Sequence, residues 1–257
     1  MKLKILFMSA NPSLDLNLDE EIRNVQMAIQ SFSKKDSVEL IHRPATRLMD
    51  MINILNLEKP HILHFAGHGG AKEGELKLIN DETGNAQLIS NNVLLKLFQT
   101  VKNDNLKLVF LNSCYSKDQS GAILESIDYI IGMNSKIGNN TARTLSTQFY
   151  SSFVSGVSLV NSFGQAEVAL MANHPSQQSV PELLTRNNDV KDFSIEDIIG
   201  KEEPQLAKEE NTKKGQSHTG SGDNVAGNKV IHTTNKTIHA EKNYEKIDNN
   251  GGTMTFN

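Results

Sequence analysis

Short apolar runs alternate with amphipathic segments along the first two thirds of the chain. Each run stops abruptly in small or polar residues, which is typical of a buried strand followed by a loop. Such runs predict the strands of one sheet. The predicted strands are Leu3–Met8, Ser37–His42, Ile62–Ala66, Leu106–Leu111 and Ile127–Met133.

Between the runs, apolar residues recur at helical spacing. The first of these segments begins with Asp19-Glu20-Glu21, and acidic residues in a first turn are favoured by the helix dipole. The helices predicted after it are Arg47–Leu57, a helix that follows Ser90, Asp118–Glu125, Asn140–Phe153 and Ser158–Ala172. Strands that alternate with helices predict an α/β fold, in which a mostly parallel sheet is covered by helices on both faces.

One segment departs from this alternation. Glu75–Ile79 and Ala86–Ile89 flank a polar turn that contains Gly84. Two short strands around such a turn predict a β-hairpin outside the main sheet.

Composition limits the classes of function. The 257 residues suffice for one full domain and an appendage, and the net charge of -4 provides no global basic field for nucleic acid or anionic lipid. The N-terminal apolar run has about four residues, fewer than the roughly 7–15 of a signal peptide, and no run is long enough to span a bilayer. A single cysteine excludes an intramolecular disulfide and fits a reducing compartment, so a cytoplasmic protein is expected.

The C-terminal part has a different composition. We expect a domain over residues 1–195 and a low-complexity tail over residues 196–257, rich in Asn, Thr, Gly, Lys and Glu. Two copies of an NKxIH pattern, Asn228–His232 and Asn235–His239, begin seven residues apart. Such a tail is either disordered or able to stack into a β-solenoid or cross-β assembly. In the second case, residues 215–257 would join copies of the chain into a homo-oligomer.

Two of the predicted strands end in residues that can carry chemistry. Pro60–Gly70 ends in His68-Gly69, and Lys107–Ser116 contains Cys114, the single cysteine. Sites in parallel sheets form beyond the carboxyl ends of the strands, so an imidazole and a thiol are expected to face each other across a cleft. The imidazole can take the proton of the thiol, and the resulting thiolate attacks carbonyl carbon. The alternative is a cysteine that only fills space in the core.

Other site chemistries find less support in the sequence. His64 and His68 form an HxxxH pattern, but His64 lies inside a predicted strand, and we expect a hydrogen-bonded interior residue rather than a metal ligand. No glycine-rich phosphate loop follows the first strand, which argues against a nucleotide-binding module. Neither a metal nor a cofactor is predicted.

Longer stretches around these residues resemble a known family. HFAGHG, VFLNSCYS and YIIGMNSKIGNNTA, together with KILFMSANP, DEEIR, FYSSFVSGVSLVNSFGQA and PELLT, resemble the CHAT peptidases, bacterial relatives of the caspases, over about residues 1–190. The resemblance implies a caspase-like fold and a cysteine endopeptidase with a Cys–His dyad. By that resemblance His68 is the general acid/base, Cys114 is the nucleophile, and the backbone N–H groups of Gly69 and Cys114 form the oxyanion hole.

The resemblance also bears on control and partners. About a dozen residues, Tyr115–Ser126, separate the cysteine strand from the next strand, so maturation by cleavage there is not expected. CHAT domains are typically joined to sensor or adaptor segments and often act in bacterial defence or regulated death. The expected partners are therefore a protein substrate and an upstream sensor or adaptor that engages the tail.

Substrate specificity is less accessible from the sequence. Asn11, Met133 and Asn134 follow or end predicted strands and are candidates for the substrate groove by position alone. Asp118 and Asp128 are acids near the relevant segments, but each is equally explained as a helix cap or a solvated residue. A catalytically silent scaffold of the same fold, and an assembly protein that acts through its tail, remain alternative functions.

Overall fold

A computed structural model describes residues 1–70, 75–101, 103–187 and 189–200. Residues 201–257 of the expected tail, and the predictions made for them, lie outside the described residues. The described part contains one six-stranded sheet in the order β2-β1-β3-β6-β7-β8. Its strands are β1 (Leu3–Ala10), β2 (Val38–Arg43), β3 (Ile62–Gly67), β6 (Leu108–Asn112), β7 (Tyr129–Met133) and β8 (Pro181–Thr185).

The sheet is parallel except at one edge. The pairs β1–β2, β1–β3, β3–β6 and β6–β7 are parallel, which confirms the predicted mostly parallel sheet. Strand β8 pairs with β7 in the antiparallel direction. The sequence pattern did not predict β8, because it is a half-buried edge strand without a continuous apolar run.

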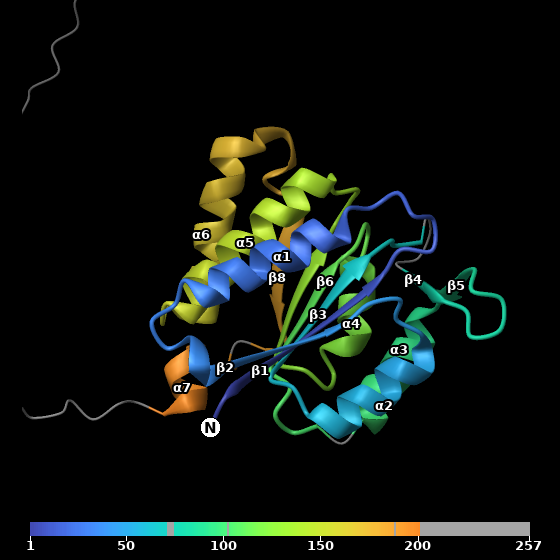
Figure 1. Cartoon of the computed structure of the whole chain (residues 1–257), viewed down its shortest axis with the longest axis horizontal. Coiled ribbons are helices and arrows are strands. Elements are labelled where there is room, and N and C mark those ends of the chain that lie inside the picture. Colours follow the sequence, from blue (N-terminus) through green and yellow to red (C-terminus); the bar gives the residue numbers. More distant parts are fainter. Residues whose placement is uncertain (71–74, 102, 188, 201–257) are drawn as a thin grey trace, which may run out of the picture. The chain divides into compact units, whose positions relative to one another are not determined.

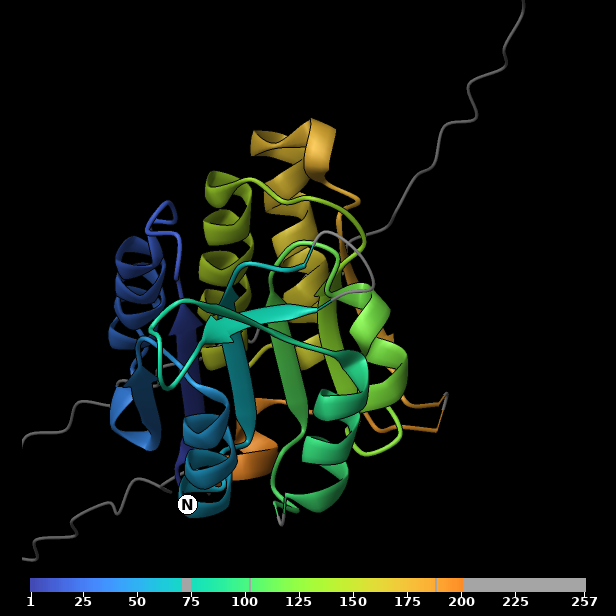
Figure 2. The same ribbon diagram turned by 90° about the vertical axis from the view of Figure 1, so that its right-hand side faces the viewer.

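Helices cover both faces of the sheet (Figures 1 and 2), as the alternating pattern predicts. The helices of one face are α1 (Leu18–Gln30), α5 (Asn139–Val154) and α6 (Leu159–Asn173), and those of the other face are α2 (Leu48–Glu58), α3 (Asn91–Thr100) and α4 (Lys117–Ile123). The predicted hairpin is present as β4 (Leu76–Ile79) and β5 (Ala86–Ile89), which pair in the antiparallel direction.

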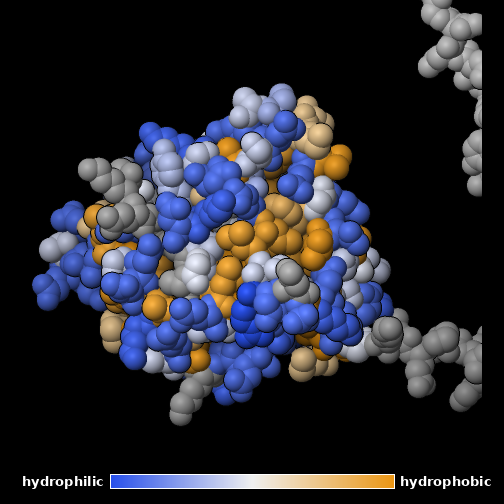
Figure 3. All heavy atoms as spheres, turned by 180° about the vertical axis from the view of Figure 1, so that it is seen from behind, coloured by the Kyte–Doolittle hydropathy of each residue, from blue (hydrophilic) through white to orange (hydrophobic). Residues whose placement is uncertain are grey.

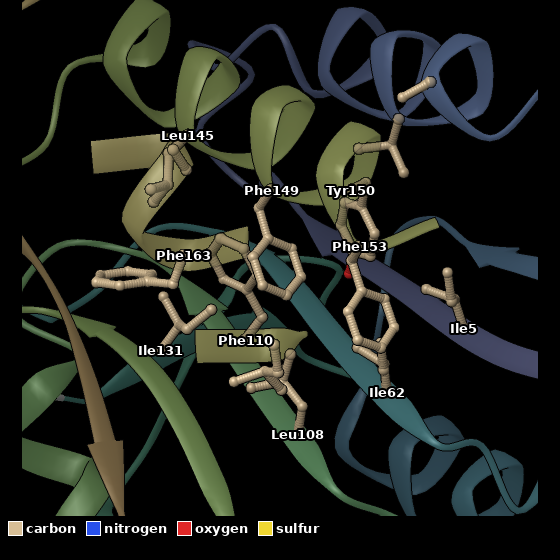
Figure 4. Close-up of a cluster of buried hydrophobic side chains, with 14 of the residues drawn as sticks. Ile5, Ile62, Leu108, Phe110, Ile131, Leu145, Phe149, Tyr150, Phe153 and Phe163 are labelled. Carbon is tan, nitrogen blue, oxygen red and sulfur yellow. The ribbon is translucent and has the colours of Figure 1, made fainter. Parts of the chain in front are cut away.

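Each face of the sheet has its own hydrophobic core, because side chains alternate along a strand. In β1, Ile5 and Phe7 belong to the core under α1 and α5, whereas Leu6 and Met8 belong to the core under α2. Figure 4 shows the first core, in which aromatic side chains of α5 point toward the sheet. Burial of a large apolar side chain contributes about 1.5–3 kcal/mol, so these two layers fix the strand ends that carry the site.

Three short helical segments complete the described fold: the 3-10 helices η1 (Lys35–Ser37) and η2 (Pro175–Gln177), and α7 (Ile195–Ile199). Ile195 is fully buried in the core under α1 and α5, so α7 belongs to this domain. The boundary expected between residues 195 and 196 falls inside this helix. Figure 3 shows a mostly hydrophilic face with an apolar area near its centre and smaller apolar patches around it. None of the described helices combines the length and apolar character needed to cross a membrane.

Candidate active site

The carboxyl ends of three parallel strands meet at one edge of the sheet. The pairing of Ala10 with Gly67, and of Ala66 with Asn112, sets the ends of β1, β3 and β6 side by side. His68 is the first residue after β3, and Cys114 is the second after β6. Both line one narrow pocket of about 40 Å³. The structure therefore brings together the two residues that the sequence singled out.

The backbone of Gly69 is packed against Cys114. A Cβ atom built on Gly69 would overlap the carbonyl oxygen of Cys114 and would lie 3.2 Å from its backbone nitrogen. Only glycine permits this approach. Among the described residues, the backbone N–H groups of Gly69 and Cys114 donate no hydrogen bond to the protein. Two unused donors therefore lie beside the thiol.

His68 has an acidic partner that the sequence analysis did not identify. Its Nε2 lies 2.7 Å from Oδ1 of Asp15, a residue in the loop between β1 and α1. The hydrogen bond with His68 is the main reason why the pKa of the Asp15 carboxyl group lies below its usual value. One ring nitrogen of His68 is thereby engaged, and Nδ1 is left for other chemistry.

The loop that carries Asp15 is organised by Asn11. The Asn11 side chain donates a hydrogen bond to the carbonyl of Leu16 at 2.9 Å and accepts one from the backbone N–H of Asp15 at 3.3 Å. Leu14 adopts a left-handed backbone conformation (φ 56°), and its N–H donates to the Asn11 carbonyl at 3.2 Å. Asn11 remains a candidate groove residue, and its amide already shapes the loop above His68.

Cys114 contacts the loop after β7. Its Sγ lies 3.9 Å from the carbonyl oxygen of Ile137, and no hydrogen bond joins it to His68 within the described part of the chain. The next residue, Tyr115, has a left-handed conformation (φ 59°) that is unfavourable for a bulky residue, and its N–H donates to the Ser135 carbonyl at 3.2 Å. This strained turn presents a half-buried thiol at the pocket.

A buried polar network lies under the pocket. His64 is fully buried, stacks on Phe7 at a centroid distance of 4.4 Å, and lies 3.2 Å from both Glu21 Oε1 and the Tyr150 hydroxyl. Asn112 donates to the same Oε1 at 2.6 Å. The expectation that His64 is a hydrogen-bonded interior residue is confirmed.

The protonation of Tyr150 sets the direction of the hydrogen bonds on either side of His64. Burial, with a smaller contribution from the charge of Glu21, raises the pKa of Tyr150 well above its usual value, so its hydroxyl keeps the proton it donates. Tyr150 can then donate to His64 Nδ1, and His64 Nε2–H to Glu21. Glu21 and Asn112 also line the pocket, so the network reaches the cavity that contains His68 and Cys114.

The other residues considered in the sequence have different surroundings. Met133 is fully buried in the core, so its side chain cannot contact a substrate and is not retained as a groove candidate. Asn134 is retained: its amide donates to the Ser179 carbonyl and to Glu182, both at 2.8 Å. Asp128 precedes β7 and pairs with Lys107 and Arg186 at the opposite edge of the sheet, away from Cys114.

Asp15 and Glu21 are the site residues that sequence reasoning missed. In the sequence, the helix dipole already explains Glu21 as an acid in a first helical turn, and Asp15 lies in a loop without periodicity. A weak signal existed, since the loop after β1 must lie at the same sheet edge as His68 and Cys114. Among the described residues, no three His, Cys, Asp or Glu side chains gather in a group that could hold a metal ion.

Comparison with known proteins identifies the family of the chain. Residues 5–218 match the CHAT domain family. A protein of Gillisia limnaea described as a probable protease is 26% identical over 159 residues, which make up 59% of this chain and 27% of that protein. The chain thus spans about a quarter of the length of this curated relative.

Solved structures show the same fold at low identity. A secreted C11 cysteine protease from Bacteroides thetaiotaomicron has a TM-score of 0.50 and 10% identity, covering 72% of this chain and 67% of that one. The Arg-specific cysteine proteinase gingipain R has a TM-score of 0.50 and 8% identity, covering 71% and 46%. The fold is therefore that of the caspase-like cysteine proteases.

Proposed function

The chain belongs to the CHAT domain family, and we propose that it is a cysteine endopeptidase in which Cys114 is the nucleophile and His68 the general acid/base. The observation that carries the proposal is the shared pocket of these two side chains at the carboxyl ends of neighbouring parallel strands. Family membership supports a protein as the substrate.

The geometry supports a specific sequence of steps. His68 takes the proton of the Cys114 thiol, and the sulfur attacks the carbonyl carbon of the scissile peptide bond. The backbone N–H groups of Gly69 and Cys114, which have no partner in the described part of the protein, bind the oxyanion that forms. His68 then gives its proton to the leaving amine. Water, deprotonated by His68, hydrolyses the thioester and restores the thiol.

The resting site needs a small adjustment before the first step. The thiol contacts the Ile137 carbonyl rather than His68. Catalytic hydrogen bonds are often long in an enzyme without substrate and tighten when the substrate binds. Displacement of the loop that contains Ile137 would free the thiol for His68. We propose that activation includes this movement.

For the cellular role, we propose an effector of a bacterial defence or regulated-death system that works in the cytoplasm. Its tail would receive a signal from an upstream sensor or adaptor and would bring copies of the peptidase domain together through residues 215–257. The support is the sequence of the tail, with its repeated NKxIH pattern. A tail-deleted protein that responds normally in cells would rule this part out.

The test compares wild type with Cys114→Ala, each induced in cells, by mass-spectrometric profiling of new protein N-termini. New termini that require Cys114 establish endopeptidase activity, and the residues before each cut define the specificity. A second arm forces the tail to oligomerise through a fused dimerisation domain. Absence of Cys114-dependent termini in both arms would contradict the proposal.

A catalytically silent scaffold is the second candidate function, favoured by the lack of a hydrogen bond between His68 and Cys114 in the described structure. The discriminating measurement is the rate at which iodoacetamide alkylates Cys114. An activated thiol reacts faster than the cysteine of an unfolded peptide at the same pH, and His68→Ala should abolish the difference. A rate equal to that of the peptide would favour the scaffold.

A further inference from the structure

His68 and Asp15 form a pair whose exposure separates two possible roles. Their hydrogen bond is 2.7 Å long, yet the Asp15 side chain is 60% exposed and the His68 side chain 20% exposed. Exposed ion pairs contribute little to folding stability, because water screens the charges and the side chains lose freedom. The pair therefore has little value as a structural element, and its short distance calls for another explanation.

The loop that carries Asp15 is held in a costly conformation. Leu14 is 88% exposed and lies in the left-handed region, which costs a non-glycine residue roughly 1–2 kcal/mol. Neither burial nor backbone preference therefore explains its position. The Asn11 side chain bridges the loop through Asp15 N–H and the Leu16 carbonyl. Strained backbone of this kind concentrates at functional sites. This loop conformation places the carboxylate of Asp15 beside His68.

We propose that Asp15 is a positioning residue of the peptidase, and this inference rests on the proposed function. Its carboxylate accepts the Nε2–H of His68 and so selects the tautomer whose Nδ1 lone pair can take the thiol proton of Cys114. After that transfer the imidazolium keeps both N–H groups, one on Asp15 and one free to protonate the leaving amine. The carboxylate balances the positive charge on the ring while that charge exists.

The same contact limits how the ring can turn. The Nε2 atom is fixed by Asp15 on the β1 side of the pocket, and Cys114 comes from β6 on the other side of β3. Rotation of the ring about its Cβ–Cγ bond would break the hydrogen bond with Asp15. Loss of Asp15 should therefore lower the rate of the chemical step without changing substrate binding.

The test uses the full-length protein and a peptide that spans a cut site found by N-terminal profiling. Asp15→Asn keeps the shape and removes the charge, Asp15→Glu restores a carboxylate, and Asp19→Asn is the control. Asp19 is also an exposed acid near the start of α1, and the structure gives it no hydrogen bond with His68. We expect Asp15→Asn to lower kcat by about 10- to 100-fold with KM within about twofold, Asp15→Glu to recover part of kcat, and Asp19→Asn to match wild type.

A melting temperature for each variant separates positioning from folding, since the exposed pair should leave it unchanged. A kcat for Asp15→Asn within about twofold of wild type would overturn the proposal while leaving the endopeptidase intact. If wild type cuts no peptide, the alkylation rate of Cys114 by iodoacetamide between pH 5 and pH 9 decides. Its midpoint should move to higher pH in Asp15→Asn, and coincident profiles would refute the role of Asp15.

Discussion

Gly69 and Cys114 touch through their backbones: a Cβ atom on Gly69 would lie 2.9 Å from the carbonyl carbon of Cys114 and would overlap its oxygen. These two residues follow different strands, β3 and β6, and their close approach is possible because Gly69 has no side chain. The proposed oxyanion donors are the N–H groups of the same two residues. The close contact between the two loops therefore also determines where the two proposed N–H donors lie.

Gly69→Ala should abolish most of the activity. The added methyl group must push the Cys114 loop away, and a displacement of about 1 Å in a catalytic site costs on the order of 100-fold in rate. The measurement is kcat/KM on the peptide used for Asp15, together with the melting temperature. Gly164→Ala in α6 is the matched control, because a Cβ there meets nothing within 4 Å. Equal activity of Gly69→Ala and wild type would show that the observed approach is not required for catalysis.

Glu21 should contribute to stability more than to chemistry. Glu21 is 4% exposed, and its carboxylate accepts hydrogen bonds from His64 and Asn112. Glu21→Ala therefore leaves the buried Nε2–H of His64 without its acceptor and removes the shorter of the two hydrogen bonds of the Asn112 amide. We expect a loss of about 3 kcal/mol in the free energy of unfolding. Glu21→Gln retains an acceptor oxygen and should lose less. Urea unfolding of the three proteins measures the difference.

The exposed neighbour Glu20 provides the control for Glu21. Its ion pair with Arg143 lies at the surface, where such pairs add little, so Glu20→Gln should unfold at nearly the same urea concentration as wild type. A Glu21→Ala protein as stable as Glu20→Gln would mean that His64 and Asn112 find other partners.

The parallel strands and their succession along the chain were accessible from the sequence because burial on both faces leaves uninterrupted apolar runs. In β3, Ile62, Leu63 and Phe65 are all fully buried, and the run that contains them ends at the site. Parallel strands then force His68 and Cys114 to the same edge. Strand β8 carries no such run, since only its first residue, Pro181, is buried. The hydrophobic pattern of the sequence therefore does not predict a strand there.

The contacts of Asp15 with His68 and of Glu21 with His64 were not accessible in the same way. Asp15 reaches His68 through a loop shaped by the Asn11 amide and a left-handed Leu14, and neither feature has a periodicity that a sequence pattern records. Glu21 occupies a helical position whose acid is already explained by the helix dipole, so its contact with His64 adds no further signal in the sequence. Side-chain contacts between distant segments require the fold.

Acidification should weaken the fold through His61. Its ring is buried, and desolvation, followed by the charges of Lys4 and Lys107, lowers its pKa in the folded protein. The unfolded chain, with a pKa of about 6.5, then binds a proton that the folded protein does not bind. Stability present above pH 6.5, roughly the unfolded value, is therefore lost as the pH falls toward the lower folded pKa.

His61→Asn tests this linkage. The backbone N–H of Lys4 donates to His61 Nδ1 at 3.0 Å, and an asparagine oxygen can accept the same hydrogen bond without titrating. The decrease in melting temperature between pH 7.5 and pH 5 should be smaller in His61→Asn than in wild type. Because the pKa of His42 is also lowered by burial, part of the decrease should persist in the variant. Equal decreases in both proteins would exclude His61 as a source.

Substitution of Tyr115 tests whether the strained turn after Cys114, the proposed nucleophile, serves catalysis. Its φ of 59° is unfavourable for any residue with a Cβ atom and most unfavourable for a β-branched residue. Tyr115→Gly should therefore raise the free energy of unfolding by about 1 kcal/mol. Tyr115→Val should lower the free energy of unfolding. Since the N–H of residue 115 donates to the Ser135 carbonyl in either variant, the path of the loop should survive in Tyr115→Gly. In Tyr115→Gly the alkylation rate of Cys114 should therefore stay within about twofold of the wild-type rate. In Tyr115→Val the alkylation rate should fall about tenfold, because the thiol turns away from His68. A fast-reacting Tyr115→Val protein would show that the thiol is activated without the left-handed turn.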